Sequence, residues 1–480
     1  MRAIFRRHPR ALPFLFLTEM WERFGFYVVQ GLLVLYMTQD FHFSDDQSYT
    51  ILGVFSALAY IAPMIGGLLA DRLLGFKKSI IWGGLFLSIG YAYLALSNTN
   101  QFYYALAIII VGNGLFKPNI SSLLGLLYPP ADMGRDAGFT IFYMGINIGV
   151  LLAGLSSGFI KNHFGWHAGF ALSSVGLLIG LSIFILGILK GAIHYKDDLI
   201  NHKNIFLKPF ALILYCIAAI PVLSLFLRSA FAGKWLLPAV GIFLLIYLFY
   251  LSMSQPNQKD RNRLITLIIL IVSAIVFWMM FLQMFFSTNL FIDRLINKNI
   301  FGMTIPTTVF YTFESIFVII LGPFFASTWQ TLNANNQNPS ALFKFVLAIF
   351  FVALAFATLG LSTYFIDSAQ LISPLWIVLS YFFLTVGEML LSPIGLSAVT
   401  LLSPAHLTGM MMGIWFVALG FGGEFAGALA KLSSIPENMT NALAQLSIYR
   451  YAFFIYALIA LIVAIGLFGV QLIVKKTIKE

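Results

Sequence analysis

The sequence predicts an all-α integral membrane protein in which two six-helix bundles flank an inserted two-helix hairpin. Of its 480 residues, 60% are apolar and only 10% are charged, and the mean hydropathy is +0.92. An ordinary soluble domain has about 45–50% apolar and about 25% charged residues, so most of this surface must face lipid. Fourteen hydrophobic stretches follow one another along the chain, and each is long enough to cross a bilayer, which takes roughly 20 residues.

Glycine, proline and charged residues mark the ends of these predicted spans. The spans are 13–38, 49–70, 79–97, 102–127, 138–160, 169–190, 208–227, 235–253, 264–291, 304–328, 342–365, 373–401, 409–431 and 448–474. The longest charged stretches, 190–208 and 254–263, flank the seventh and eighth spans. We therefore expect an N-terminal bundle over 1–190, an inserted transmembrane hairpin with its cytoplasmic linkers over 191–263, and a C-terminal bundle over 264–480.

The distribution of basic residues predicts the orientation in the membrane. The loops on the side of the N-terminus carry nineteen lysines and arginines, and those on the opposite side carry seven. Because cytoplasmic loops are enriched in positive charge, both termini are expected on the cytoplasmic side. The chain is expected in the inner membrane of the cell. Glu19, Glu22 and Arg23 interrupt the first apolar stretch, so no cleavable signal peptide is expected.

The remaining composition excludes several classes of site. The net charge is +10 and the pI about 9.5, but no dense basic run suits phosphate recognition, so no nucleic-acid partner is expected. The single cysteine, Cys216, excludes an internal disulfide framework and a cysteine metal cluster. None of the seven histidines lies deep in a predicted span. No metal, cofactor or enzymatic activity is therefore predicted.

Seven ionisable residues lie inside predicted spans, where a charge costs roughly 2.5–3.5 kcal/mol. They are Glu19, Glu22, Arg23, Lys117, Glu314, Glu388 and Glu424. Burial in a medium of low dielectric favours the neutral, protonated form of a glutamate. Five acids against two bases therefore indicate proton carriers rather than simple ion pairs.

The first and fourth spans hold four of these residues. Glu19, Glu22 and Arg23 are spaced three and four residues apart, so they share one helical face. Lys117, in Gly112-Asn113-Gly114-Leu115-Phe116-Lys117-Pro118-Asn119, has no local acid and must find its anion on the first span or on a substrate carboxylate. Competition between these anions would couple protonation to substrate binding. The alternatives are a salt-bridged segment that tolerates charge and a static interhelical salt bridge.

Four motifs follow one another along the chain. The first is Glu19-Met-Trp-Glu22-Arg23-Phe24-Gly25-Phe26-Tyr27. The others are the loop Gly66–Lys78, the segment Phe139–Leu151 and Glu388-Met389-Leu390-Leu391-Ser392-Pro393-Ile394-Gly395. From about Thr18 to Gly427 the chain thus resembles the proton-dependent oligopeptide transporters of the major facilitator superfamily, which usually have tyrosine at the position of Phe26.

This resemblance implies the major facilitator fold and a set of functional residues. By this resemblance, the residues expected to couple transport to protons are Glu19, Glu22, Arg23 and Lys117, and those expected to form a cytoplasmic gate are Asp71 and Arg72. Substrate contacts fall to Arg23, Tyr27, Tyr60, Lys117, Asn147, Glu388 and Trp415. In this scheme Lys117 faces the substrate's carboxylate and Glu388 its amino group. For each aromatic residue taken alone, membrane packing is the alternative.

Two departures from the family pattern change what is expected of the site. Many members pair an arginine and a glutamate as an extracellular gate, but Gln30 and Leu282 occupy those positions, so the gate must be held in another way. Glu314 stands where the family usually has asparagine. We expect it to contact substrate and, if ionised, to favour a cationic group; if protonated, it acts only through hydrogen bonds.

The predicted function is proton-coupled import of di- and tripeptides by alternating access of the two bundles, with the chain working as a monomer in lipid. Uptake of an amino acid or another small non-peptide solute on the same fold is the main alternative, because fold does not settle substrate. A multipass membrane enzyme would need a metal or nucleophile cluster at one membrane face. A channel would need repeated polar rings along a pore, and a nutrient sensor is the remaining alternative.

Overall fold

The computed structural model describes residues 8–128, 134–195, 207–229, 235–300, 302–404 and 407–477. The chain divides into two compact units. Unit 1 comprises Met1–Tyr36 and Leu58–Ala230, and unit 2 comprises Met37–Ala57 and Phe231–Glu480. The boundary crosses helix α3 (Asp45–Leu69), so the first half of this helix belongs to unit 2 and the second half to unit 1.

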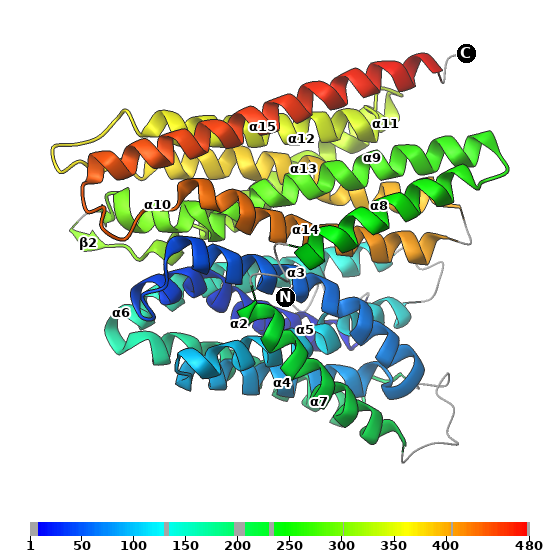
Figure 1. Cartoon of the computed structure of the whole chain (residues 1–480). Coiled ribbons are helices and arrows are strands. Elements are labelled where there is room, and N and C mark those ends of the chain that lie inside the picture. The colour runs from blue at the N-terminus through cyan, green and yellow to red at the C-terminus, as the bar shows by residue number, and fades with distance from the viewer. Residues whose placement is uncertain are drawn as a thin grey trace. The chain divides into compact units, whose positions relative to one another are not determined.

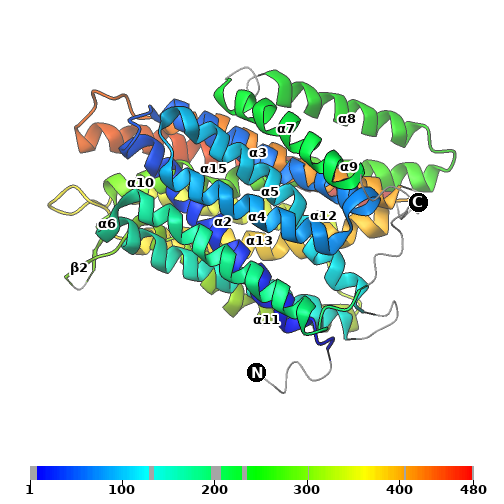
Figure 2. The ribbon, with the colours of Figure 1, turned by 90° about the horizontal axis from the view of Figure 1, so that it is seen from below.

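Unit 1 is built from long helices joined by short loops. Besides the end of α3, it contains α2 (Leu12–Gln39), the π-helical turn η1 (Ala70–Leu74), α4 (Phe76–Leu96), α5 (Thr99–Leu126), α6 (Arg135–Leu189) and α7 (Leu207–Arg228). Helices α4 and α5 lie side by side (Figure 2). Glycine permits this close approach, because a Cβ at Gly83 would lie 2.6 Å from the backbone nitrogen of Phe116. Helix α6 turns at Gly165, whose φ is +82°, so its two arms are the predicted spans 138–160 and 169–190.

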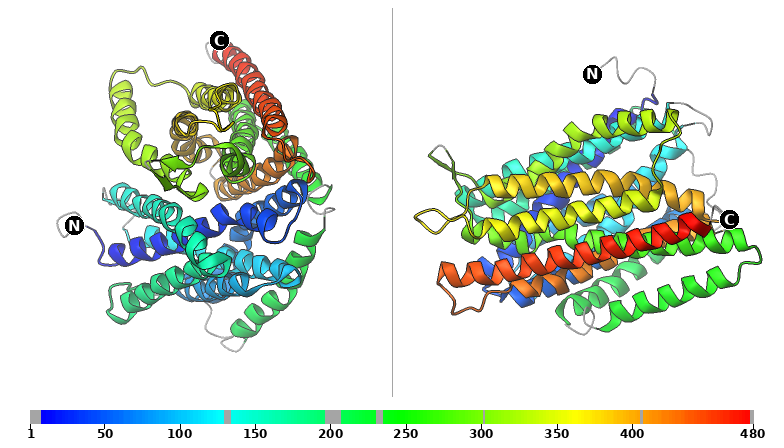
Figure 3. Two further views of the ribbon diagram at one scale, coloured as in Figure 1. Left: turned by 90° about the vertical axis from the view of Figure 1, so that its left-hand side faces the viewer. Right: turned by 90° about the horizontal axis from the view of Figure 1, so that it is seen from above.

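Unit 2 holds the second set of membrane helices. They are α8 (Leu237–Met253), α9 (Gln258–Phe281), α10 (Ser287–Leu295), α11 (Thr312–Ala334), α12 (Ala341–Ser362), α13 (Leu375–Leu402), α14 (Thr408–Ala430) and α15 (Ala442–Thr477). The 3₁₀ turns η4 (Leu282–Phe285), η5 (Thr307–Val309) and η6 (Lys431–Ser433) interrupt them. Helices α12, α13 and α15 pack together (Figure 1), and the red C-terminal helix runs along its neighbours in Figure 3.

Two predicted spans differ from the helices observed. The ninth, 264–291, is broken at Leu282–Phe285, where the Gln283 amide donates to the carbonyl oxygen of Ala426 at 2.9 Å. The tenth, 304–328, becomes α-helical only at Thr312, after the 3₁₀ turn η5. The antiparallel strands β1 (Asn299–Ile300) and β2 (Met303–Thr304) and then Pro306 occupy the segment before it.

Within the described residues, ten helices are long and apolar enough to cross a membrane, with both arms of α6 counted as one. Helices α7 and α8 contribute shorter apolar stretches, and α2 contains Glu19, Glu22 and Arg23. The predicted fold class, an all-α membrane protein, is confirmed. The total of fourteen spans stays a prediction.

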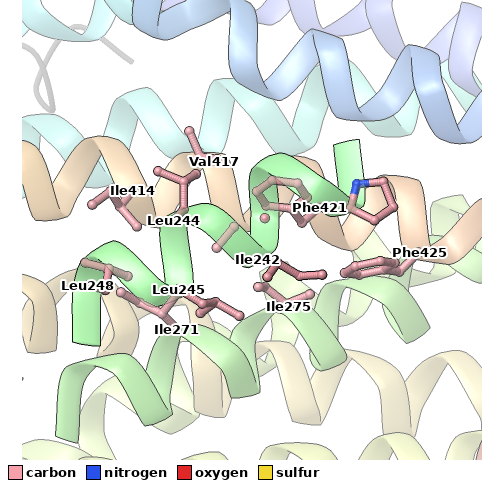
Figure 4. A pocket seen from close by; sticks show the side chains of 13 residues that line it. Ile242, Leu244, Leu245, Leu248, Ile271, Ile275, Ile414, Val417, Phe421 and Phe425 are labelled. Atoms are coloured by element: carbon pink, nitrogen blue, oxygen red, sulfur yellow. The ribbon is translucent and has the colours of Figure 1, made fainter. Parts of the chain in front are cut away.

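The two helices of the predicted hairpin pack in different units. In unit 1, Leu212 and Cys216 of α7 join a buried cluster with Val111 and Leu115 of α5. In unit 2, α8 packs on α9 and α14, where an apolar cavity of about 280 Å³ remains (Figure 4). Its walls include Ile242, Ile271 and Phe421, and none of the predicted site residues lines it.

Candidate functional site

The first candidate cluster lies on α2 in unit 1. Glu19, Glu22 and Arg23 are all buried, with at most 3% of each residue exposed. The Nε atom of Arg23 donates a hydrogen bond to Oε2 of Glu22 and lies 3.4 Å from Oε1 of Glu19. The sequence spacing therefore places the three charges together as predicted, because residues three and four apart share a helical face.

This cluster has spare hydrogen-bonding capacity. Oε2 of Glu19, Oε1 of Glu22 and Nη2 of Arg23 are buried and have no hydrogen-bond partner within the described residues. Two carboxyl groups beside one guanidinium cannot both be neutralised by it. The remaining negative charge has to be balanced by a proton or by a second base.

Helices α5 and α6 bring further candidate residues to this cluster. A Cβ at Gly149 on α6 would lie 3.1 Å from the Cβ of Arg23, so glycine allows α6 to approach α2. On α5, Lys117 is half-buried and lies in electrostatic range of Glu19, Glu22 and Arg23. Its Nζ sits 4.4 Å from the centre of the Tyr60 ring, and in the described chain no carboxylate lies within ion-pair distance of it. Lys117 is thus near the acids but is not bound to one.

The other unit 1 candidates are less closely tied to the acids. Tyr27 lies one turn beyond Arg23 and interacts with it electrostatically. The Asn147 amide is buried and donates to the carbonyl oxygen of Tyr143 on its own helix at 3.1 Å. Asp71 and Arg72 are exposed on the π-helical turn that ends α3. The sequence placed this pair in a loop, whereas the helix continues through it to Gly75.

The second candidate cluster lies in unit 2 on α11 and α13. Glu314 and Glu388 are 9% and 7% exposed, and their carboxyl groups lie in electrostatic range of each other. The hydroxyl of Ser315 donates to Oε2 of Glu314 at 3.0 Å. Oε2 of Glu388 has no partner among the described residues.

Trp415 and Glu424 lie nine residues apart on α14, which places them on opposite faces of the helix. Trp415 is 3% exposed and packs against α13, because a Cβ at Gly395 would lie 2.3 Å from its ring. Glu424 is 7% exposed and has an unpartnered Oε2 in the part of the chain described. The structure therefore separates Glu424 from the face that carries Trp415.

Three polar residues were missed by sequence reasoning, two of them in the cluster on α11 and α13. Ser315 and Tyr381 were missed because they are uncharged and lie in apolar spans. In the structure, Tyr381 precedes Glu388 by two helical turns and interacts electrostatically with Glu314. Asp45 stood at a predicted loop end. It is buried at the start of α3 and accepts hydrogen bonds from both Nη atoms of Arg294, at 2.7 and 2.6 Å.

The departure at the predicted extracellular gate is also visible. Gln30 and Leu282 are buried, with 3% and 4% exposed, and Oε1 of Gln30 has no hydrogen-bond partner in the described residues. Neither side chain can form an ion pair.

A family model described as "PTR2: POT family" matches residues 77–449 of the chain. The chain is 36% identical over 447 residues to the peptide transporter YePEPT of Yersinia enterocolitica, covering 88% of this chain and 87% of that protein. It is 33% identical over 462 residues to the dipeptide and tripeptide permease B of Xenorhabdus bovienii, covering 95% and 94%.

Solved structures are similar along nearly the whole chain. A crystal structure of the peptide transporter POT in complex with sulfate aligns with a TM-score of 0.83 at 30% identity and covers 97% of this chain and 94% of that one. A POT family transporter in complex with 5-aminolevulinic acid aligns with a TM-score of 0.82 at 26% identity, with 96% of each chain covered.

Proposed function

The chain belongs to the POT family, and from this premise we propose that it imports di- and tripeptides by symport with protons. The observation that carries the proposal is the pair of acids on α2 that share one arginine. Glu19 and Glu22 both contact Arg23, yet each keeps one buried oxygen unpartnered within the described residues. The names of the two relatives, a peptide transporter and a dipeptide and tripeptide permease, support the choice of substrate.

In the proposed cycle, protonation and substrate binding alter the same set of contacts. When Glu22 accepts a proton, its hold on the Arg23 guanidinium weakens, because the ion pair becomes a neutral hydrogen bond. Lys117 then competes with Arg23 for the remaining carboxylate and for the carboxylate of the peptide. Release of the proton restores the Arg23 pair. Proton and peptide therefore travel together through alternating access of the two bundles.

Purified protein in liposomes tests this proposal. An inward proton gradient should drive accumulation of a radiolabelled dipeptide, and a protonophore should abolish it. Glu22→Gln should retain counterflow exchange, because the amide preserves binding geometry, but should lose gradient-driven accumulation. Glu437→Gln, at an exposed site, serves as the control. Accumulation by wild type without any gradient would overturn symport, and normal driven uptake by Glu22→Gln would move the proton site elsewhere.

A second candidate function is uptake of a small non-peptide solute that has both an amino and a carboxyl group. The complex of a POT family transporter with 5-aminolevulinic acid favours it. A competition assay separates the two candidates. A dipeptide, a tripeptide, free alanine and 5-aminolevulinic acid are each added in excess during uptake of labelled dipeptide, and each lowers that uptake in proportion to its affinity.

The proposal includes the state and setting of the protein. The excess of basic residues in one set of loops supports an inner-membrane protein with both termini in the cytoplasm. We take the monomer, embedded in lipid, as the functional form. The division into bundles 1–190 and 264–480 with an inserted hairpin over 191–263 is part of the same proposal, as are the gating roles of Asp71 and Arg72.

A further inference from the structure

The cavity between α8, α9 and α14 has only apolar walls. Thirteen apolar residues line it, and Figure 4 shows side chains from the three helices around it. A buried water molecule needs about two to four polar partners, and a peptide backbone needs hydrogen-bond partners as well, so neither suits this space. Ile242 lines the cavity and is also 60% exposed. The cavity therefore opens at the outer surface of α8, where lipid is the solvent.

The size of the cavity suits a hydrocarbon chain. An apolar cavity of about 150 Å³ in another protein stays dry and binds benzene, and this one measures about 280 Å³. Along α8 its walls extend from Pro238 to Leu248, about ten residues or about 15 Å at the α-helical rise. One leaflet contributes half of a hydrocarbon core that is about 30 Å thick. The cavity thus has the length that a lipid acyl chain needs.

The turn that follows α8 carries positive charge. Lys259, Arg261 and Arg263 lie in the first two turns of α9 with one acid, Asp260, which leaves an excess of two positive charges. Arg263 lies 3.9 Å from Asp260, whereas within the described residues neither Lys259 nor Arg261 forms an ion pair. The Nε atom of Arg261 is buried and has no hydrogen-bond partner in the same part of the chain. This turn can therefore bind an anion.

Helical geometry places Arg261 on the cavity side of α9. It precedes Ile275, which lines the cavity, by fourteen residues; this is close to four helical turns, so the two residues share a face. It precedes Ile271, another wall, by ten residues, or about 15 Å. The turn between α8 and α9 lies at the same end of unit 2 as the end of α15 (Figures 1 and 2). This is the side predicted to face the cytoplasm.

We propose that unit 2 binds one anionic phospholipid of the cytoplasmic leaflet. The phosphate group lies at Arg261 with Lys259 near it, and one acyl chain fills the cavity between α8, α9 and α14. Basic residues next to the cytoplasmic end of a transmembrane helix attract anionic lipid, and burial of the chain adds a hydrophobic contribution. None of the residues proposed for transport takes part. The lipid instead joins α8 to the helices on which it packs.

Native mass spectrometry of the delipidated full chain in detergent counts the lipids that bind. Dioleoyl phosphatidylglycerol should form one adduct and bind at least about fivefold more tightly than dioleoyl phosphatidylcholine, which has the same chains but no net charge; fivefold is the gain expected from one basic residue near anionic lipid. Arg261→Gln should lower the affinity for phosphatidylglycerol by about this factor and leave that for phosphatidylcholine unchanged. Lys190→Gln is the control, because it removes an exposed lysine at the end of α6, and should change neither affinity.

A second variant tests the acyl-chain site. Ala418 is buried and lines the cavity, so Ala418→Phe should fill it and weaken both lipids to the same extent. Ile246→Phe is the control, since Ile246 is exposed on α8 and is not among the lining residues. If Ala418→Phe does not fold, wild type decides: dihexanoyl phosphatidylglycerol and inorganic phosphate should not bind, because neither reaches the cavity.

Three results would overturn the proposal. Equal affinity of wild type for the two dioleoyl lipids, or full affinity of Arg261→Gln for phosphatidylglycerol, would refute the headgroup site at Arg261. Binding of dihexanoyl phosphatidylglycerol as tight as that of the dioleoyl lipid would refute the acyl-chain site. A dimer without bound lipid would assign the cavity to a second copy of the chain.

Discussion

Lys117 is the residue whose replacement should separate coupling from folding. Its ammonium group lies over Tyr60 and near the acids of α2, but no ion pair fixes it in the described chain. Lys117→Ala should reduce gradient-driven dipeptide accumulation to the level seen with a protonophore, because the change removes a counter-charge for the acids and the proposed contact with the peptide carboxylate. Uptake into proteoliposomes is the measurement.

The matched control for Lys117 is Lys161, another unit 1 lysine that lies over an aromatic ring, with Nζ 4.1 Å from the centre of Trp166. Lys161→Ala removes a cation–π contact of the same kind outside the α2 cluster and should leave accumulation intact. Normal accumulation by Lys117→Ala would show that the lysine is structural.

Helix α3 depends on Asp45 for its attachment to unit 2. The carboxylate accepts two hydrogen bonds from Arg294 and one from the backbone nitrogen of Ile435 at 2.9 Å. Removing one partner of a buried ion pair lowers the free energy of unfolding by about 3–5 kcal/mol. The loss for Asp45→Ala should lie at the lower end of this range, because the Arg294 side chain is 25% exposed. Thermal unfolding in detergent measures the loss.

Asp46 provides the control for Asp45, since both acids lie in the first turn of α3. Its side chain is 59% exposed and lies 3.2 Å from Nζ of Lys431, and an exposed pair contributes about 0–1 kcal/mol. Asp46→Ala should therefore change the melting temperature little. Equal losses for the two variants would mean that Asp45 does not anchor the helix.

Helix α8 should affect stability rather than substrate affinity. A Cβ at Gly241 would lie 3.1 Å from Cε1 of Phe421 on α14, so Gly241→Leu should displace α8 and lower expression and melting temperature. The KM for dipeptide should stay within tenfold, which corresponds to about 1.4 kcal/mol. Gly322→Leu is the control, because no atom lies within 4 Å of its Cβ position. A larger change in KM for Gly241→Leu alone would show that α8 takes part in substrate binding through the helices on which it packs.

At the scale of the whole molecule, the distribution of basic residues predicts which loops face the cytoplasm. Ser368 and Gln337 are exposed and lie on loops expected on opposite sides of the membrane. In a Cys216→Ser background, a membrane-impermeant maleimide should label Ser368→Cys on intact cells. It should label Gln337→Cys only after permeabilisation. The reverse pattern would invert the proposed topology.

Much of the architecture follows from local properties that the sequence displays directly. A bilayer requires long apolar helices, so hydropathy located α2, α5, α12 and α14 within a few residues of their ends. The proximity of Glu19, Glu22 and Arg23 was likewise predictable, because helical periodicity alone brings these side chains together. The resemblance to a transporter family added candidate residues on other helices, such as Tyr60, Asn147 and Trp415.

Contacts between distant segments were decided only by the tertiary structure. The amino acids at positions 314 and 388 indicate two buried acids, but nothing in their spacing shows that the two carboxyl groups lie in electrostatic range of each other. The same holds for Asp45 and Arg294, which are 249 residues apart. The sequence by itself thus determined where the helices lie and which charges are buried, because solvent and helical period act locally. Only packing decided which charges meet, because that depends on glycine-mediated approach between helices, as at Gly149 and Gly395.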